Sequence, residues 1–209
     1  MLLMKKIFDE IIVDGKTYNV IIEKKRIKNC YFRFYNGEFH ASCPYFYPKI
    51  MLMNLLKKYA KGLIKEPRVD LENHKIQILG ETIYSESHTF NILGHIVKVN
   101  DEEDFYKKIK PILHRYISNR VLELTKVMEV PILYKVRVQK MKSRLGSNSR
   151  ATNTLNFTLK LIHFSKGAID SVIIHELAHY FHFNHSRDFY NVVYKYCPNY
   201  DKLNKEFKD

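Results

Sequence analysis

The chain has 209 residues, of which 45% are hydrophobic and 13% aromatic, and its formal net charge is +13. This length suits one large domain or two small ones, and the hydrophobic content is enough for a sizeable core. No apolar run approaches the roughly 18 residues that a membrane span needs, so we expect no membrane partner. The charged start is not typical of a signal peptide, and three widely spaced cysteines favour a reducing compartment, so we expect a cytoplasmic protein.

Residues 7–40 are predicted to form β-strands. A turn signal at Asp14-Gly15 lies between two β-branched runs, and Asn36-Gly37 gives a second turn signal. Side chains alternate in residues 31–35 as they do in a half-buried strand. We therefore expect this part of the chain to be an antiparallel meander that serves as a scaffold.

The period changes to that of a helix in residues 48–66, which Glu66-Pro67 is expected to end. Residues 74–99 return to a strand pattern, with turns expected at Gly80 and Gly94. The first half of the chain is thus predicted to be rich in strands and to contain one helix.

Residues 101–129 carry the longest helical pattern in the chain. Acidic residues fill its first turn, which suits the helix dipole, and Pro111 either kinks the helix or marks its true start. Within residues 132–164 a polar loop is predicted to separate two strands. We place a domain boundary before the long helix, with a β-rich subdomain at 1–100 and a second domain at 101–209.

The run at 173–186 contains His175, Glu176 and His179 in the order H-E-x-x-H. Residues four apart lie on one face of an α-helix, so the two imidazoles can bind one metal ion while Glu176 reaches a water on that ion. The apolar run before the motif predicts a buried helix. Unpaired histidines and a glutamate in such a helix would be costly, and a bound metal removes that cost. We therefore expect one zinc ion.

Catalytic zinc sites usually have three protein ligands and a fourth position open for water, so we look for a third ligand. His182 would lie near the same helical face, but three ligands in one straight row cannot surround an ion. His185 follows Asn184, a residue type that tolerates a left-handed helix end and would let the chain reverse. We expect His185 to be the third ligand, with His182 as the alternative.

The positive charge is concentrated before the motif. Residues 130–169 contain no Asp or Glu, while Lys and Arg occur at Lys135, Arg137, Lys140, Lys142, Arg144, Arg150, Lys160 and Lys166. Such a stretch indicates an anionic partner, although a generally lysine-rich composition would explain it as well. We expect a weak association with nucleic acid through this basic surface and make no prediction of the oligomeric state.

The C-terminal half resembles the YgjP-like metallopeptidase-domain family, a relative of the SprT-like and WLM zincins. The residues that carry the resemblance are 143–147, 154–157, 169–179, 184–186 and Phe189. The order of the predicted elements is also similar, so the resemblance covers most of the chain. Leu145 and Asn148 stand where the family usually has Trp and Cys, so the metal ligands are unaffected, whereas any role of an indole N–H or a thiol is lost.

The resemblance implies an α+β fold with a minimal, gluzincin-like zincin core that follows the N-terminal antiparallel subdomain. A small sheet would pack against the metal helix, with an edge strand around 152–158 beside the cleft. His175, His179 and His185 would bind zinc, and Glu176 would be the general base. Candidate substrate or oxyanion contacts are Arg144, Asn156, Arg187, Tyr190 and Tyr194, although the tyrosines are equally compatible with a core position.

A zinc-dependent hydrolase, most naturally a metallopeptidase, is the function that these features favour. The motif indicates hydrolysis but leaves the substrate open between a peptide and a nucleotide. The basic stretch keeps two alternatives, a metal-dependent nucleoside triphosphate pyrophosphohydrolase and a SprT-like protease that acts near nucleic acid. A purely structural zinc site is disfavoured, because such sites are usually closed by four ligands.

Overall fold

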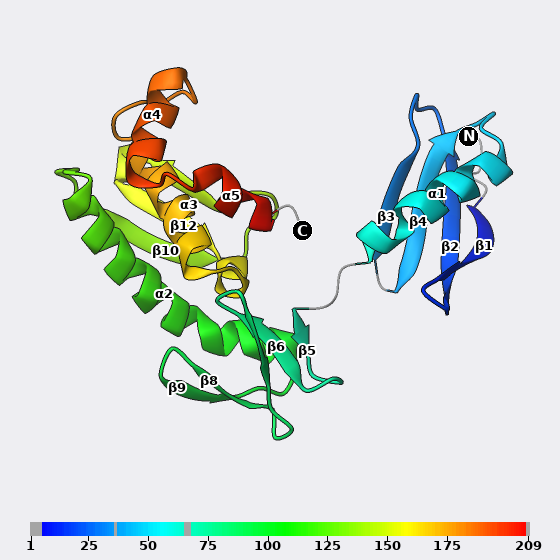
Figure 1. Cartoon of the computed structure of the whole chain (residues 1–209), viewed down its shortest axis with the longest axis horizontal. Helices are drawn as coiled ribbons and strands as arrows, with labels where there is room; N and C mark the ends of the chain where they lie inside the picture. Colours follow the sequence, from blue (N-terminus) through cyan, green and yellow to red (C-terminus); the bar gives the residue numbers. More distant parts are fainter. Residues whose placement is uncertain (1–5, 36, 65–67, 208–209) are drawn as a thin grey trace. The chain divides into compact units, whose positions relative to one another are not determined.

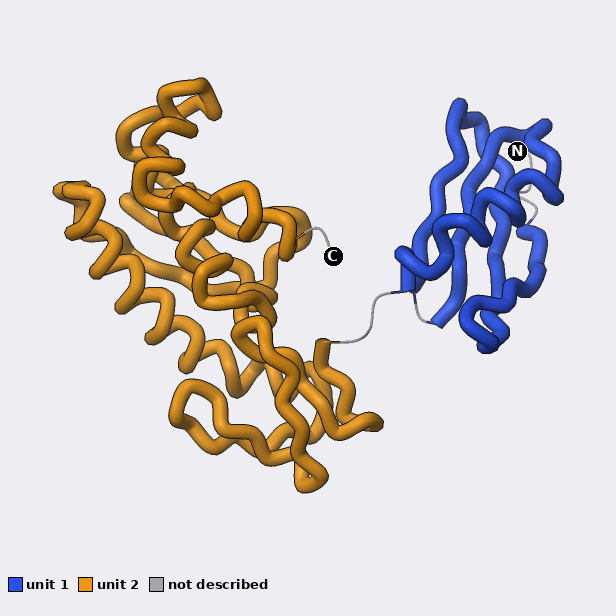
Figure 2. The backbone as a smooth tube through the Cα atoms, in the orientation of Figure 1, with its two compact units in different colours: residues 1–66 blue, residues 67–209 orange. Residues whose placement is uncertain are grey.

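The computed structural model divides by its backbone contacts into two compact units, residues 1–66 and residues 67–209 (Figure 2). The structure describes residues 6–35, 37–64 and 68–207. The sequence features at residues 1–5, Asn36 and Glu66-Pro67 lie outside the described residues. None of the described helices is long and apolar enough to cross a membrane.

Unit 1 is a four-stranded sheet with one helix lying across one of its faces (Figure 1). Its elements are β1 (Lys6–Val13), β2 (Lys16–Lys25), β3 (Tyr31–Tyr35), β4 (Glu38–Pro44) and α1 (Lys49–Leu63). A separate small core includes Val20, Phe39, Leu52 and Leu56. The predicted hairpin at Asp14-Gly15 is confirmed, because β1 and β2 pair antiparallel across this turn.

The expected antiparallel meander is wrong. The strand order is β1-β2-β4-β3, and β4 runs parallel to β2, so the sheet of this N-terminal unit is mixed. A meander would have placed β3 beside β2. The burial of the strands gives the reason: alternate residues of β4 are buried, whereas β3 has five residues, none of them buried, and occupies the edge.

Unit 2 mixes small sheets with helices, and the whole chain has the predicted mixture of helices and sheets. Its strands are β5 (Val69–Asp70), β6 (Lys75–Ile78), β7 (Glu81–Tyr84), β8 (Thr89–Ile92), β9 (His95–Lys98), β10 (Lys135–Gln139), β11 (Gly146–Ser149) and β12 (Thr154–Thr158). Its helices are α2 (Glu102–Val127), α3 (Lys166–Ala178), α4 (Arg187–Tyr196) and α5 (Tyr200–Asn204), with 3-10 turns η1 (Arg150–Thr152), η2 (Leu159–His163) and η3 (Lys205–Phe207).

The chain divides after residue 66, not after residue 100 as the sequence pattern indicated. Ile76 and Phe90, from the strands before residue 100, belong to the same hydrophobic core as Phe105 and Ile109 of α2. The change from a strand pattern to a helix pattern therefore marks a new element within one core. It does not mark the start of a new unit.

Two hairpins of unit 2 use the same turn. Leu79 and Gly80 have φ of 51° and 85°, and Leu93 and Gly94 have φ of 52° and 83°. Positive φ at both central residues is the geometry of a type I′ turn, so the turns predicted at Gly80 and Gly94 are confirmed. The N–H of Leu79 donates to the carbonyl of Ile162 at 2.7 Å, which ties the first hairpin to the segment that leads into α3.

The long helix α2 begins where the acidic first turn predicted. Asp101 caps it, since its side chain accepts the N–H of Asp104 at 2.8 Å. The helix passes through Pro111 and continues to Val127, so Pro111 does not mark its start. α2 packs against both β10 and α3.

The three-stranded sheet of unit 2 has the order β10-β12-β11. The predicted edge strand around 152–158 is therefore wrong: β12 is central, with four of its five residues buried. The edges are β10 and β11, and β11 lies within the expected polar loop at 142–153 and packs against α3. Its small polar residues lack the apolar alternation by which a strand is usually recognised.

Helix α3 is anchored from two directions. Ser165 caps its start by accepting the N–H of Ala168 at 3.1 Å, and the carboxylate of Glu206 accepts from both the N–H and the Oγ of Ser165. Farther along, Arg120 of α2 donates to both oxygens of Asp170 at 3.0 and 2.7 Å. These contacts fix the helix that carries the H-E-x-x-H motif.

His163 is fully buried just before α3. Its Nδ1 lies 2.6 Å from the carbonyl oxygen of Gln77 and its Nε2 lies 2.7 Å from the hydroxyl of Tyr106. Nδ1 therefore donates to the carbonyl, and the hydroxyl donates to Nε2. Burial lowers the pKa of His163 to about 4, so the ring is neutral near pH 7.

We predict that unit 2 loses stability as the pH falls from about 6.5 towards 4. The unfolded chain binds a proton at His163 in this range and the folded chain does not, so the His163 contribution is fully present above the unfolded pKa and decreases as the pH falls. The loss from this one group is on the order of 3 kcal/mol at most. Urea unfolding between pH 4 and pH 7 measures it.

His163→Phe is the comparison variant for this experiment. It leaves the Tyr106 hydroxyl and the Gln77 carbonyl without their partner, which lowers the free energy of unfolding at pH 7 by about 1–3 kcal/mol. Its unfolding free energy should also depend less on pH than that of the parent protein. Equal pH dependence in both proteins would show that His163 is not the responsible group.

Candidate metal centre

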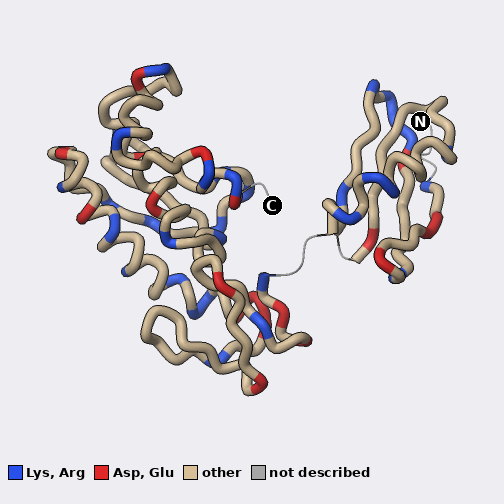
Figure 3. Tube along the Cα trace, viewed as in Figure 1, with Lys and Arg blue, Asp and Glu red and all other residues tan. Residues whose placement is uncertain are grey.

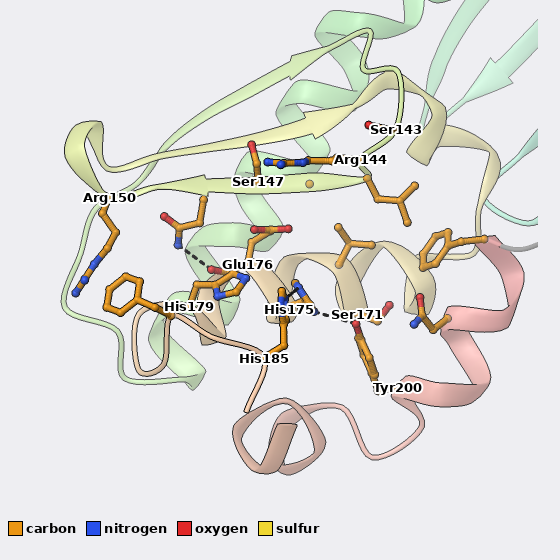
Figure 4. A pocket seen from close by; sticks show the side chains of 17 residues that line it. Ser143, Arg144, Ser147, Arg150, Ser171, His175, Glu176, His179, His185 and Tyr200 are labelled. Carbon is orange, nitrogen blue, oxygen red and sulfur yellow. Dashed lines mark hydrogen bonds between the residues drawn. The ribbon is translucent and has the colours of Figure 1, made fainter. Parts of the chain in front are cut away.

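His175, His179 and His185 bring one ligand nitrogen each to within 4.8 Å of one another. His175 lies in the last turn of α3, and His179 is the residue at which the helix ends. His185 lies just before α4, with its Nε2 atom 3.1 Å from the Nε2 atom of His175. The three rings face one point at the floor of a cleft (Figure 4).

The chain reverses between His179 and His185 without the left-handed residue that we expected. Helix α3 stops at Ala178, and the positive-φ residues of the described chain do not include Asn184. The reversal is built instead from tight turns, in which Phe181 and His182 donate their N–H groups to the carbonyl of Ala178. The side chain of His182 is not part of the cluster of three histidines.

The hydrogen bonds of the ring nitrogens fit a metal site. The Nδ1 atom of His175 lies 2.9 Å from the hydroxyl of Tyr200, and the Nδ1 atom of His179 lies 3.2 Å from the carbonyl oxygen of His182. A proton on each Nδ1 satisfies these bonds and leaves both Nε2 lone pairs directed at the common point. Three neutral imidazoles are a donor set that suits zinc and leaves a fourth position open.

Burial favours the neutral form of His175 and His179. The pKa of His175 is lowered to about 4, mainly by burial and to a smaller extent by the neighbouring rings of His179 and His185. Burial likewise lowers the pKa of His179. Neutral imidazoles whose nitrogen lone pairs converge can accept a cation, because a metal ion binds only the unprotonated nitrogen.

Glu176 lies beside the histidines with 6% of its surface exposed. Burial raises its pKa to about 7, against the opposing effects of Arg144 and of the backbone amide of Asn148. A Cβ atom added to Gly146 would lie 2.7 Å from Oε1 of Glu176, so strand β11 touches the carboxylate where it has no side chain. The side chain of Asn148 also donates to the backbone carbonyl of Glu176 at 2.8 Å.

The cleft above this cluster has a volume of about 620 Å³. One wall is the segment from Ser143 to Arg150, which includes β11, and the opposite wall includes α3 and the turn that follows it (Figure 4). The cleft thus runs along an exposed sheet edge and places Glu176 beneath that edge. This arrangement brings together a metal-binding set, a buried carboxylate and free strand backbone.

The other candidate substrate contacts lie in different parts of the structure, some in the cleft and some outside it. Arg144 lines the cleft, whereas Asn156 lies in β12 and donates to Ser147 Oγ at 3.3 Å. Arg187 and Tyr190 lie in α4, which Ser186 caps, and neither is a cleft residue. Tyr194, also in α4, donates to Asp201.

Tyr200, Phe183 and Arg150 line the cleft but were not selected from the sequence. Tyr200 follows His175 by 25 residues and belongs to a different helix, so no local spacing connects the two. Arg150 stood out only as one cation of the acid-free stretch. A cluster of aromatic residues around the histidines was visible in the sequence and was the one available indication for Phe183.

Three converging histidine nitrogens beside a buried glutamate are typical of metal-dependent hydrolases. The chain belongs to the YgjP-like, metallopeptidase domain family, whose sequence model matches residues 72–209, and the resemblance drawn from the sequence is confirmed. The chain is accordingly a metallopeptidase-family protein, and this family implies a divalent metal.

Two solved structures are similar to part of the chain. One is the metallopeptidase zymogen of Methanocaldococcus jannaschii jannalysin, which is 23% identical with a TM-score of 0.40 over 44% of this chain and 92% of that chain. The other is the metallopeptidase zymogen of Pyrococcus abyssi abylysin, which is 19% identical with a TM-score of 0.41 over 44% of this chain and 90% of that chain. No similar protein was found among curated proteins.

We predict that Tyr200→Phe weakens zinc binding about tenfold. The hydroxyl orients the ring of His175 through Nδ1, and loss of such a partner typically costs this much affinity. Competition against a chromophoric chelator measures the dissociation constant. Tyr194→Phe is the matched control, because its hydroxyl binds Asp201 and no histidine, and equal affinity in both variants would contradict the role given to Tyr200.

Proposed function

We propose that the protein is a zinc-dependent peptidase with a minimal zincin core, in which His175, His179 and His185 hold one ion and Glu176 is the general base. The observation that supports this most directly is the position of the buried Glu176 carboxylate under the edge strand and beside the three converging nitrogens. Zinc in such a set lowers the pKa of a bound water towards ~7 and polarises the carbonyl that is attacked.

Glu176 takes up and returns the proton in this proposal. A carboxylate with a pKa of about 7, raised by burial, can accept a proton near neutral pH and then donate it to the leaving nitrogen. The backbone amide of Asn148 interacts with the carboxylate, and the absence of a side chain at Gly146 leaves room for it beside the strand. The role of Arg144 is to stabilise negative charge that develops at the cleft.

An extended peptide fits the cleft because β11 offers free backbone groups. The N–H of Thr158 donates to the carbonyl of Leu145, so the backbone groups of alternate residues 145, 147 and 149 face β12. The backbone groups of Gly146 and the carbonyl of Asn148 then face away from β12, while the N–H of Asn148 is directed at the Glu176 carboxylate. A peptide can pair with them as an added strand and present its carbonyl above Glu176.

Nucleoside triphosphate pyrophosphohydrolysis is the second candidate, and two arginines in the cleft favour it. Association with nucleic acid has weaker support, because Lys and Arg are spread over both units (Figure 3). A peptide accounts for the exposed strand edge, which a nucleotide does not need. We therefore place the peptidase first.

The deciding experiment compares the zinc-loaded protein with Glu176→Gln on a degenerate peptide library and on nucleoside triphosphates. Peptide cleavage should fall by about 100- to 10,000-fold in the variant, because the general base is lost. Removal of the metal with a chelator should abolish cleavage, and added zinc should restore it. Pyrophosphate release without peptide cleavage, lost in Glu176→Gln, would replace the peptidase by the second candidate.

Metal content is the control for this experiment. Glu176→Gln should retain one zinc per chain, and so should His182→Ala, whereas His185→Ala should lose the ion. Retention of zinc by His185→Ala together with its loss from His182→Ala would reverse the assignment of the third ligand.

Gly146→Ala should reduce peptide cleavage at least about tenfold while leaving zinc affinity nearly unchanged. The new methyl group would lie 2.7 Å from Oε1 of Glu176 and must displace the carboxylate, and displacement of a catalytic group by about 1 Å can cost 100-fold. Gly62→Ala is the control, since no neighbouring atom lies within 4 Å of that added Cβ. Full activity of Gly146→Ala would contradict the position assigned to the base.

A further inference from the structure

Arg150 stands at the end of the cleft where β11 stops and η1 begins. Its Cζ atom lies 3.3 Å from the ring centroid of Phe183, which belongs to the turn between His179 and His185. The contact therefore joins the strand wall of the cleft to the wall that carries the metal ligands, and Figure 4 shows Arg150 at this end of the cleft, beyond His179. The pair is at the surface, with 53% of Phe183 exposed.

Stacking on a ring restrains a guanidinium without using its N–H groups. The planar guanidinium keeps its N–H donors along its edge, where a carboxylate can accept two parallel hydrogen bonds. None of the described carboxylates forms an ion pair with Arg150, in contrast to Arg120, which is paired with both Asp170 and Glu123. Arg150 is thus oriented by Phe183 and left open to an anion from outside.

The cleft contains little negative charge to oppose it. Among the described residues that line the cleft, Glu176 is the one carboxylate, and it lies beneath β11. Arg144 and Arg150 line the same cleft, and a zinc ion would add two further positive charges. A ligand with a negatively charged group is therefore favoured over a neutral one.

We propose that this cleft selects acidic peptides, in which an Asp or Glu side chain close to the cleaved bond pairs with Arg150. This inference rests on the proposed peptidase function and names its substrate class. Arg144 and Arg150 flank opposite ends of β11, and the four residues of that strand span about 10 Å. Such a separation matches different residues of an extended peptide better than one compact phosphate group.

The register of β11 limits where the acidic residue lies. Gly146 lies over Glu176, so the bond that is attacked is close to Gly146. Arg150 is four residues farther along, and its long side chain can reach back towards the strand. The acidic residue should therefore lie about two to four residues from the cleaved bond, since strand pairing moves one residue per ~3.3 Å.

The test uses peptide pairs that differ by Asp against Asn, or Glu against Gln, at each of these positions. The zinc-loaded parent protein should cleave the acidic member about five- to tenfold more efficiently, mainly through KM, as expected of one oriented ion pair. Arg150→Gln should remove this preference and leave kcat/KM for the amide peptides within twofold. Arg150→Glu should reverse it, so that Lys is preferred at the same position.

Arg137→Gln is the matched control, because it removes the same charge from an exposed position on β10, outside the cleft. Phe183→Leu removes the stacking partner and should reduce the acidic preference without abolishing it. An acidic preference that persists in Arg150→Gln, or that disappears equally in Arg137→Gln, would overturn the proposal.

A binding measurement separates this inference from the proposed function. Fluorescent forms of the same peptide pairs are titrated with zinc-loaded Glu176→Gln, with and without Arg150→Gln. Tighter binding of the Asp or Glu peptide that requires Arg150, without cleavage by the parent protein, would support the binding site for an acidic residue and reject the peptidase. Equal binding of both peptide members would overturn the acidic site, and Arg150-dependent binding of a nucleoside triphosphate in its place would do the same.

Discussion

The contact between Gly146 and Glu176 is the constraint on which the site depends. A sheet edge and a helix approach each other so closely that no side chain fits between the strand backbone and the carboxylate. The side-chain amide of Asn148, two residues along the strand, donates to the backbone carbonyl of Glu176 and holds the same approach from a second point. The positions of β11, the Glu176 carboxylate and the metal ligands therefore depend on one another, because a shift of β11 would move the carboxylate relative to the histidines.

Helix α3 holds these groups in fixed positions because segments distant in the sequence bind it. Arg120 binds Asp170 in its second turn, and Glu206 binds its capping residue Ser165. Near its end, Tyr200 binds His175 directly. Each of these contacts spans at least 25 residues of sequence, so the histidine and glutamate positions are determined by unit 2 as a whole.

The sequence predicted what depends on local rules. The H-E-x-x-H spacing needs only one helix, and the acidic first turn marks the start of α2 by residue type alone, which is why these features were found. The position of β11 could not be predicted in this way. Its residues GSNS show no apolar alternation, and its place is set by pairing with β12 and by the small residue facing Glu176.

Long-range pairing explains the other differences. Turn signals located the hairpins, but strand order in unit 1 depends on which strand buries more of its surface, and so β4 separates β3 from β2. Asn184 had the residue type of a helix end, yet α3 stops six residues earlier and tight turns make the reversal. The partner of His175 was missed because Tyr200 approaches it from another helix.

The two type I′ turns of unit 2 need the same backbone conformation, but they differ in how well they tolerate a substitution. Gly80 and Gly94 have nearly the same φ, but an added Cβ at Gly80 would lie 3.1 Å from the backbone of Ser165, whereas nothing lies within 4 Å of one at Gly94. Asn tolerates a positive φ, so it is an acceptable replacement at Gly94. At Gly80 it would press against the residue that caps the metal-binding helix, and homologous chains should therefore vary at the second turn before they vary at the first.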